Sequence, residues 1–184
     1  LDSYGNVVET AYDLNGDGKI DSVVFYRLTY TSDGLLVQKL MQSDDYKILR
    51  EYAHDTRGNI TNERYTEYSC VDCSDAASIT VWERTFDADD QILSEMDRID
   101  YGADGKVDWL AESQWTYNAN GDVLIYWKNR DENVDGTYDF LTQRTFTYTA
   151  NHYMQSQTYI EDIKNDGVLE TKYTAESEFT WMCP

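Results

Sequence analysis

The sequence predicts an all-β fold, an antiparallel meander of about twelve strands made from six hairpin repeats of roughly 31 residues each. A turn motif recurs through the whole chain, and an acidic loop recurs at a constant distance from it. The segments between them alternate apolar and polar side chains, as half-buried strands do. We therefore expect residues 1–184 to form a single repeat domain, because each repeat needs its neighbours to bury its apolar face.

The turn motif is an aromatic or apolar residue followed by a polar turn, in most copies with Gly four residues on and an aliphatic residue six residues on. Asp33-Gly34, Arg57-Gly58-Asn59 and Asn120-Gly121 are typical of hairpin turns. The motif begins at Leu1, Tyr30, His54, Phe86, Tyr117 and Tyr148, and a terminal strand with a seventh start at Phe179 follows. Connections this short predict that consecutive strands pair with each other.

Two strands are expected in each repeat, one on either side of its turn. In the last complete repeats, residues 107–117, 123–129 and 169–179 are the clearest strand candidates. One face of the first candidate carries Val107, Trp109, Ala111, Ser113, Trp115 and Tyr117. Such a one-sided sheet must hide its apolar face. A curled or rolled, barrel-like sheet is the preferred expectation, followed by a sandwich and then a propeller.

The acidic loops are DLNGDGKID from Asp13, DYGADGKVD from Asp100, DENVDGTYD from Asp131 and DIKNDGVLE from Asp162. Oxygen-bearing side chains stand at alternate positions, a Gly follows, and an acid closes each loop. Ca²⁺ prefers about six to eight oxygen ligands and needs a tight turn to gather them. An EF-hand is excluded, because Val24 stands where the first loop would need its twelfth-position Glu.

Calcium is therefore the expected cofactor, bound at up to four loops. Most of the ligands are side-chain oxygens, and one residue of each loop contributes its backbone carbonyl. The predicted sets are Asp13, Asn15, Asp17, Lys19 and Asp21; Asp100, Asp104, Lys106 and Asp108; Asp131, Asn133, Asp135, Thr137 and Asp139; and Asp162, Asp166, Val168 and Glu170. The carbonyl donors are Lys19, Lys106, Thr137 and Val168.

Two resemblances follow from these motifs. The strings HDTRGNI at His54, FDADDQIL at Phe86 and YNANGDVL at Tyr117 resemble the YD repeats of Rhs-type and teneurin-like bacterial surface proteins. The loops resemble the D-x-N-x-D-G-x-x-D calcium loops of integrin-type and thrombospondin type 3 repeats. The YD-repeat families have shorter repeats and lack regular acidic loops, so their toxin-enclosing shell is not implied. The resemblances imply an exported, calcium-binding surface protein.

The composition limits the possible partners. The formal net charge is −20, from 35 acidic and 15 basic residues, which excludes general binding to nucleic-acid phosphates and disfavours anionic membranes. No apolar run has the length of a membrane helix. We expect an extracellular or cell-surface location with a signal peptide already removed, since millimolar extracellular calcium would fill such loops.

The third repeat has Cys70-Val71-Asp72-Cys73 in place of an acidic loop. A zinc site would need a second pair of cysteines, and haem attachment would need His where Ser74 stands. A local disulfide between Cys70 and Cys73 is the preferred interpretation, and three reduced cysteines are the alternative. Cys183 is then left over for an intermolecular bond or a free thiol.

The ends of the repeat array suggest self-assembly. The residues concerned are Leu1 in the first motif position and Phe179, Trp181 and Cys183 in the last strand. The preferred expectation is head-to-tail strand addition between chains, which gives a filament when it does not close. Closure of the sheet within one chain and a monomer with frayed ends are the alternatives.

Three functions remain open at this point. The preferred one is a structural protein of a cell surface, extracellular matrix or filament. A calcium-dependent carbohydrate-binding or adhesion module is the alternative, using Trp82, Trp109, Trp115 and Trp127. A hydrolase is the weakest, because the best-placed acids are repeated and His54 and His152 occupy turn positions. We therefore expect no enzymatic activity.

Overall fold

The computed structural model describes residues 2–3, 6–13, 18–20, 22–164, 167–169 and 171–176. Twelve strands and no helix occur in this part of the chain. They are β1 (Glu9–Tyr12), β2 (Ser22–Tyr30), β3 (Leu36–Gln42), β4 (Lys47–His54), β5 (Ile60–Tyr68), β6 (Ala76–Phe86), β7 (Ile92–Tyr101), β8 (Trp109–Tyr117), β9 (Val123–Asp131), β10 (Phe140–Tyr148), β11 (Met154–Asp162) and β12 (Thr171–Glu176).

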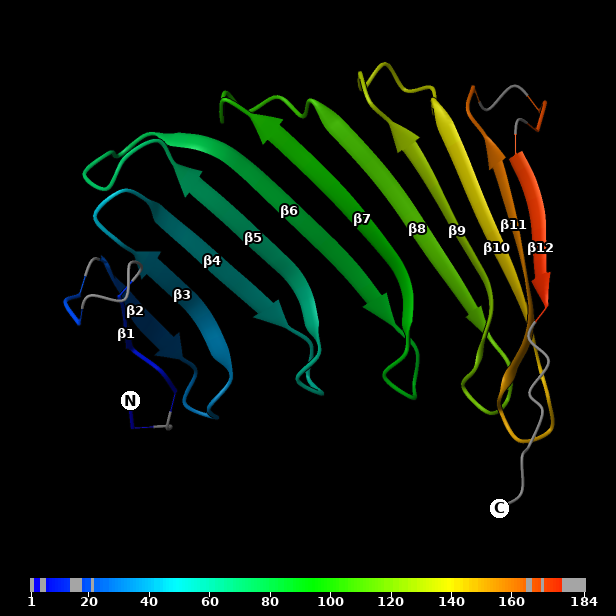
Figure 1. Ribbon diagram of the computed structural model, residues 1–184, viewed down its shortest axis with the longest axis horizontal. Coiled ribbons are helices and arrows are strands. Elements are labelled where there is room, and N and C mark those ends of the chain that lie inside the picture. Colours follow the sequence, from blue (N-terminus) through cyan, green and yellow to red (C-terminus); the bar gives the residue numbers. More distant parts are fainter. Residues whose placement is uncertain are drawn as a thin grey trace. The chain divides into compact units, whose positions relative to one another are not determined.

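The strands follow chain order in the sheet, from β1 to β12, as Figure 1 shows. Each neighbouring pair for which the register is known is antiparallel. The predicted all-β meander of about twelve strands is confirmed. Among the described residues the order begins at β1 and ends at β12, so the sheet is not closed into a barrel.

The strand boundaries agree with the alternation in the sequence. The strand expected over residues 107–117 is β8, and the one expected over 123–129 is β9, which continues to Asp131. The last expected strand is β12 up to Glu176, and residues 177–179 lie outside the described part. On β8 the predicted inner face includes Ala111 and Ser113, which are buried, while Gln114 and Thr116 on the other face are exposed.

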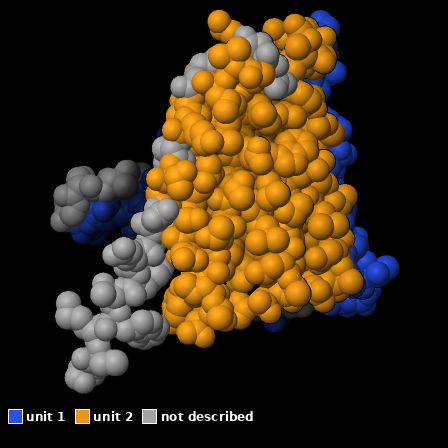
Figure 2. Space-filling model, turned by 90° about the vertical axis from the view of Figure 1, so that its right-hand side faces the viewer, with its two compact units in different colours: residues 1–83, 97–108 blue, residues 84–96, 109–184 orange. Residues whose placement is uncertain are grey.

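The chain divides into two compact units. One comprises Leu1–Glu83 and Asp97–Asp108, and the other comprises Arg84–Met96 and Trp109–Pro184. Figure 2 shows them in blue and orange. The first unit contains β1 to β5 and the second contains β8 to β12, while β6 and β7 contribute residues to both. The acidic loop at residues 100–108 belongs to the first unit, and the loops at residues 131–139 and 162–170 belong to the second.

Six turns of the repeat in the described residues share the same two hydrogen bonds. Each begins with Asp, Asn or Thr, whose side-chain oxygen accepts the backbone N–H four residues later at 2.9–3.2 Å. The backbone N–H of that first residue donates to the carbonyl of the same later residue at 2.8–3.0 Å. The first turn residues are Asp2, Thr31, Asp55, Asp87, Asn118 and Thr149. In turns, Asp, Asn and Thr side chains bond backbone N–H groups that would otherwise bond the neighbouring strand. The repeated sequence motif therefore forms the same hydrogen bonds in each turn.

The fourth turn position explains why Gly recurs there. Gly58 and Gly121 have φ of +94° and +86°, in the left-handed region that glycine adopts without steric cost. Asp90 and His152 occupy the same position with φ of +64°. Asp and His tolerate this conformation better than most residues, so these two turns keep their shape without glycine.

Few apolar side chains are buried in this sheet. Among the described residues the buried hydrophobic ones are Val24 and Ala111, while the buried polar ones include Asp100, Asp131 and Asp162. The sequence has enough apolar residues for a core, but most side chains of the described strands are only half covered. The expected hidden apolar face is therefore formed only in part.

Cross-strand side-chain pairs cover the sheet faces where a second layer is lacking. Arg50 lies 5.2 Å from the ring centroid of Tyr65 and pairs with Glu63 at 3.1 Å. In the other unit, Trp115 and Tyr126 have centroids 5.3 Å apart, and Arg144 lies 5.5 Å from the Tyr159 ring. Such pairs contribute roughly 0.2–1 kcal/mol each, so many are needed to stabilise a single layer.

Candidate functional site

The acidic loops connect the strands at the hairpin ends opposite the turns. Residues 13–21 join β1 to β2, 100–108 join β7 to β8, 131–139 join β9 to β10, and 162–170 join β11 to β12. Of the predicted ligands, Asn15, Asp17, Asp21, Asp166 and Glu170 lie outside the described residues. The four predicted carbonyl donors are described, and all four are exposed.

One hydrogen bond recurs in all four loops. The backbone N–H of the Gly at the sixth loop position donates to Oδ2 of the first Asp at 2.8–3.0 Å. The pairs are Gly18 with Asp13, Gly105 with Asp100, Gly136 with Asp131 and Gly167 with Asp162. The shared loop sequence thus forms a shared hydrogen bond, in which the first carboxylate accepts an N–H of its own loop.

The closing acid of a loop is also held by the backbone. Asp108 Oδ2 accepts the N–H of Tyr101 at 2.6 Å, and Asp139 Oδ2 accepts the N–H of Glu132 at 2.8 Å. The N–H groups of Asp108 and Asp139 continue the strand ladder to Ile99 and Arg130. In the loops at residues 100–108 and 131–139, the first and last acids are therefore both tied to backbone N–H groups of the loop.

The middle acids cap their own turns. Asp104 Oδ1 accepts the N–H of Lys106 at 2.9 Å, and Asp135 Oδ1 accepts the N–H of Thr137 at 2.8 Å. The Lys106 N–H bond is the main cause that lowers the pKa of Asp104, and the Lys106 side chain, 3.4 Å away, adds to it. Among the described residues no three His, Cys, Asp or Glu side chains converge as a metal cluster. The carboxylates are directed to loop amides instead.

The first acids of the loops differ in how much of their surface is exposed. Asp13 is exposed, whereas Asp131 and Asp162 retain 1% and 2% of their surface. Asp131 Oδ1 is buried and has no hydrogen-bond partner. The side-chain oxygen of Asn129, two residues earlier on β9, is also buried without a partner. A buried acceptor without a donor is costly, so these two oxygens are the most unusual feature of the loop end.

Three residues beside this loop were not among the predicted ligands: Asn129, Glu112 and Tyr138. The register places Glu112 opposite Asn129 and Leu110 opposite Asp131, so Glu112, Asn129 and Asp131 share one face. The Tyr138 hydroxyl donates to the Glu112 carboxylate. Burial and then this bond raise the pKa of Tyr138 to about 12. Strand alternation around Asp131 was the sequence signal that could have indicated Asn129.

The expected disulfide is present between Cys70 and Cys73. It closes the β5–β6 connection, where the acidic loop is missing. Lys47 Nζ donates to the Cys73 carbonyl at 2.8 Å and lies 3.9 Å from the Tyr68 ring centroid. The predicted assembly residues Leu1, Phe179, Trp181 and Cys183 lie outside the described residues.

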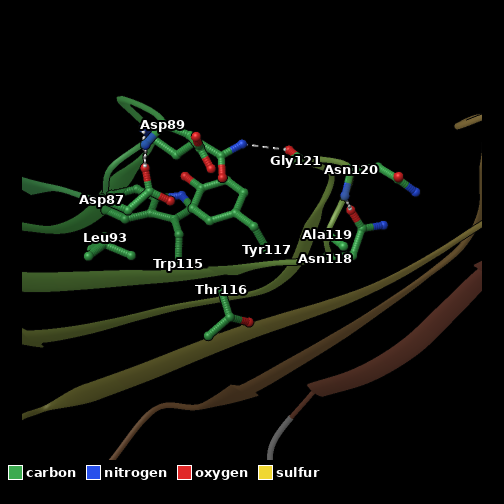
Figure 3. Close-up of a pocket in the computed structure, with 11 residues that line it drawn as sticks. Asp87, Asp89, Leu93, Trp115, Thr116, Tyr117, Asn118, Ala119, Asn120 and Gly121 are labelled. Carbon is green, nitrogen blue, oxygen red and sulfur yellow. Dashed lines mark hydrogen bonds between the residues drawn. The ribbon is translucent and has the colours of Figure 1, made fainter.

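The turn end of the second unit contains an open cleft of about 560 Å³ (Figure 3). It lies between the turn at residues 87–91 and the turn at residues 118–121, with Trp115 and Tyr117 from β8. Most of its polar groups bond one another: Gln91 Nε2 donates to the Gly121 carbonyl at 3.1 Å, and Tyr117 donates to the Ile92 carbonyl at 2.8 Å. Trp82, Trp109 and Trp127 are half-buried elsewhere in the sheet.

No helix in the described part of the chain is long and apolar enough to cross a membrane. Comparisons with protein-family models and with curated proteins found no match for this sequence.

Proposed function

We propose that this chain is an exported, calcium-binding β-repeat structural protein of a cell surface, extracellular matrix or filament. The observation that carries the proposal is the hydrogen bond shared by the four acidic loops, in which a Gly N–H holds one oxygen of the first Asp. In the loop at residues 131–139 the other oxygen of that Asp is buried without a partner. A bound cation would supply the missing partner.

The charge of the protein supports the same proposal. A net charge of −20 opposes the compact state through self-repulsion, and each acidic loop concentrates several carboxylates in nine residues. Bound Ca²⁺ would offset this repulsion and would draw the middle and closing acids away from the loop amides that they now cap. The single-layer sheet has few buried apolar side chains, so ion binding would contribute a large share of its stability.

Calorimetric titration of chelator-treated protein with Ca²⁺ tests the proposal. We expect binding heat and a melting temperature that rises with Ca²⁺ concentration, because the ion binds the folded state. Mg²⁺ is the matched control, since it demands tighter octahedral geometry and should bind these loops more weakly. Absence of Ca²⁺ heat together with an unchanged melting temperature in chelator would refute calcium binding.

An extracellular location is part of the proposal. The Cys70–Cys73 disulfide is consistent with an oxidising compartment, and export itself remains to be tested by fractionation of the source cells. We propose a structural rather than a catalytic role because the acids of the loops are repeated and are engaged with backbone amides.

Head-to-tail assembly by strand addition completes the proposal. The end strands β1 and β12 each have one partner strand in the described part of the sheet, and such edges pair with other chains unless they are covered. Sedimentation with Ca²⁺ should show concentration-dependent assembly, and removal of residues 179–184 should abolish it without unfolding the sheet. A chain that stays monomeric at high concentration with Ca²⁺ would contradict assembly.

A carbohydrate-binding or adhesion module is the second candidate, and the cleft beside Trp115 is the observation that favours it. Sugars are bound by aromatic faces with planar polar side chains beside them, and Asp87, Gln91 and Asn118 are of that type. Saturable quenching of tryptophan fluorescence by oligosaccharides would support this function. Trp115→Leu should remove the quenching, and Trp82→Leu should not, because Trp82 does not line the cleft.

A further inference from the structure

The four acidic loops are not equivalent, and the difference lies in the second oxygen of the first Asp. In the loop at residues 100–108, Asp100 Oδ1 accepts the N–H of Asp104 at 3.1 Å. In the loop at residues 162–170, Asp162 Oδ1 accepts the N–H of Lys164 at 3.3 Å. Asp131 Oδ1 has no such donor, although Asp131 is almost completely buried. A buried carboxylate oxygen in this state needs a cation, a proton or an ordered water.

The surroundings of Asp131 favour a cation. Asn129 Oδ1, on the same face of β9, is a second buried oxygen without a donor. Glu112 faces Asn129 across the β8–β9 ladder and lies diagonally from Asp131. Among the described residues neither Asp131 nor Glu112 forms an ion pair. Two carboxylates on one face without a basic partner create a negative potential that attracts a cation.

The basic side chains of β9 lie on the opposite face from Asn129 and Asp131. Lys128 and Arg130 alternate with Asn129 and Asp131 along β9 and so belong to the opposite face of the sheet. Arg130 lies 4.3 Å from the Phe140 ring centroid, and Lys128 lies 5.6 Å from the Trp109 ring centroid. The positive charges of β9 therefore contact aromatic rings on the opposite face and do not neutralise Asp131 and Glu112.

Comparison of neighbouring repeats shows that Asn129, Glu112 and Tyr138 occur beside only one of the three loops compared. One repeat later, 31 residues on, Asn129, Glu112 and Tyr138 are replaced by Ile160, Gln143 and Leu169. One repeat earlier their places hold Arg98, Val81 and Val107. The register confirms the first comparison, since Ile160 faces Gln143 as Asn129 faces Glu112. The loop at residues 131–139 is therefore flanked by a facing pair of strand-borne oxygen side chains, and its two neighbours lack such a pair.

We propose that the loop at residues 131–139 is the primary divalent-cation site, in which Asp131 Oδ1 and Asn129 Oδ1 are ligands and Glu112 supplies balancing charge. Tyr138 positions Glu112 through its hydroxyl bond. The inference rests on the proposed calcium binding and goes further, because it adds ligands from the strands to those of the loop. A cation held in this way links β8, β9 and the β9–β10 connection.

Titration of the full chain with Ca²⁺, and with Tb³⁺ as a luminescent substitute, tests the assignment. Asn129→Ile copies the next repeat and removes one oxygen, and Glu112→Gln removes one charge. Each should weaken the tightest site by tenfold or more. Glu132→Gln is the matched control, because Glu132 is exposed, adjoins Arg130 at 3.5 Å and lies in the same loop. It removes the same charge and should change affinity by less than about threefold.

Asn129→Asp separates ligation from packing, since it keeps an oxygen at the same place. We expect it to bind at least as tightly as the unaltered chain. Equal weakening by the Asp and Ile variants, or undiminished affinity in Asn129→Ile and Glu112→Gln, would overturn this assignment while calcium binding by the loops survives. Failure of the unaltered chain to bind Ca²⁺ or Tb³⁺ would overturn the proposed function as well. Melting temperatures in chelator show whether each variant folds.

Discussion

The two ends of the hairpins satisfy their polar groups in different ways. At the turn end, an Asp, Asn or Thr side chain and the backbone bond each other, and the same pattern appears six times. At the acidic-loop end, carboxylates accept loop N–H groups, but Asp131 retains a buried oxygen without a partner. The turn end is complete within the chain, whereas the loop end is suited to a cation.

A third arrangement occurs between β5 and β6, where the loop lacks the repeated acids. There the Cys70–Cys73 disulfide closes the connection, and Lys47 caps the Cys73 carbonyl. The longer connections at this end thus differ in how they close, by a covalent bond between β5 and β6 and by repeated acids in the acidic loops. The short β3–β4 connection closes through the Ser43 N–H, which donates to the Tyr46 carbonyl at 3.0 Å.

Calcium removal should produce the largest difference in amide hydrogen exchange between the loop end and the turn end of the hairpins. A site held at a hundredfold excess over its Kd stabilises the fold by about 2.7 kcal/mol. In chelator, hydrogen exchange should therefore accelerate at the loop amides of Gly105 and Gly136 and stay unchanged at the turn amides of Gly58 and Gly121. Mass-spectrometric exchange with and without Ca²⁺ measures this. Uniform acceleration at both ends would show that the ends are not independent.

Reduction of the disulfide should have the next largest effect. The loop that it closes is very short, and the chain-entropy relation then gives about 2 kcal/mol. In urea unfolding, the double variant Cys70→Ser, Cys73→Ser should lose this amount of stability, and the loss should be the same with Ca²⁺ and with chelator. A loss seen only in chelator would mean that this connection depends on an ion after all.

Asn118→Ala should weaken one turn. Asn118 Oδ1 accepts the N–H groups of Asn120 and Asp122, and its Nδ2 donates to Asp122. Loss of these bonds should cost about 1–2 kcal/mol, measured by urea unfolding, whether Ca²⁺ is present or not. Asn118→Asp should restore the two bonds from the backbone N–H groups, as Asp55 and Asp87 make them, but it should recover only part of the loss because its carboxylate would repel that of Asp122. A calcium-dependent loss would contradict the self-sufficiency of the turn end.

Asp90→Gly should have the smallest effect, and it should be stabilising. Asp90 adopts a φ of +64° at a turn position where Gly58 and Gly121 stand in other repeats. Glycine relieves the strain of the left-handed conformation but loses more backbone entropy on folding. The net increase in the free energy of unfolding should be roughly 0.5 kcal/mol. Asp89→Gly is the control, since Asp89 does not have a positive φ and should gain nothing. Thermal melting of both variants checks the prediction.

The sequence by itself determined the local structure. The turn motif, the alternation along residues 107–117 and the nine-residue loops predicted the all-β meander, the turns and the loop ends. The Cys70–Cys73 spacing predicted the disulfide. These features depend on residues close in the chain, where side-chain type and backbone preference decide the conformation, so they could be predicted without knowledge of distant contacts.

Only the tertiary structure decided which polar groups are left buried without partners. Asn129 and Glu112 are far apart in the sequence, and the β8–β9 register brings them to one face with Asp131. The low burial of apolar residues was likewise decided by the single layer, because composition cannot tell whether a sheet face finds a second layer. The physical reason is that burial and hydrogen-bond satisfaction are set by strand pairing and layering, whereas turns and loops are set by local sequence.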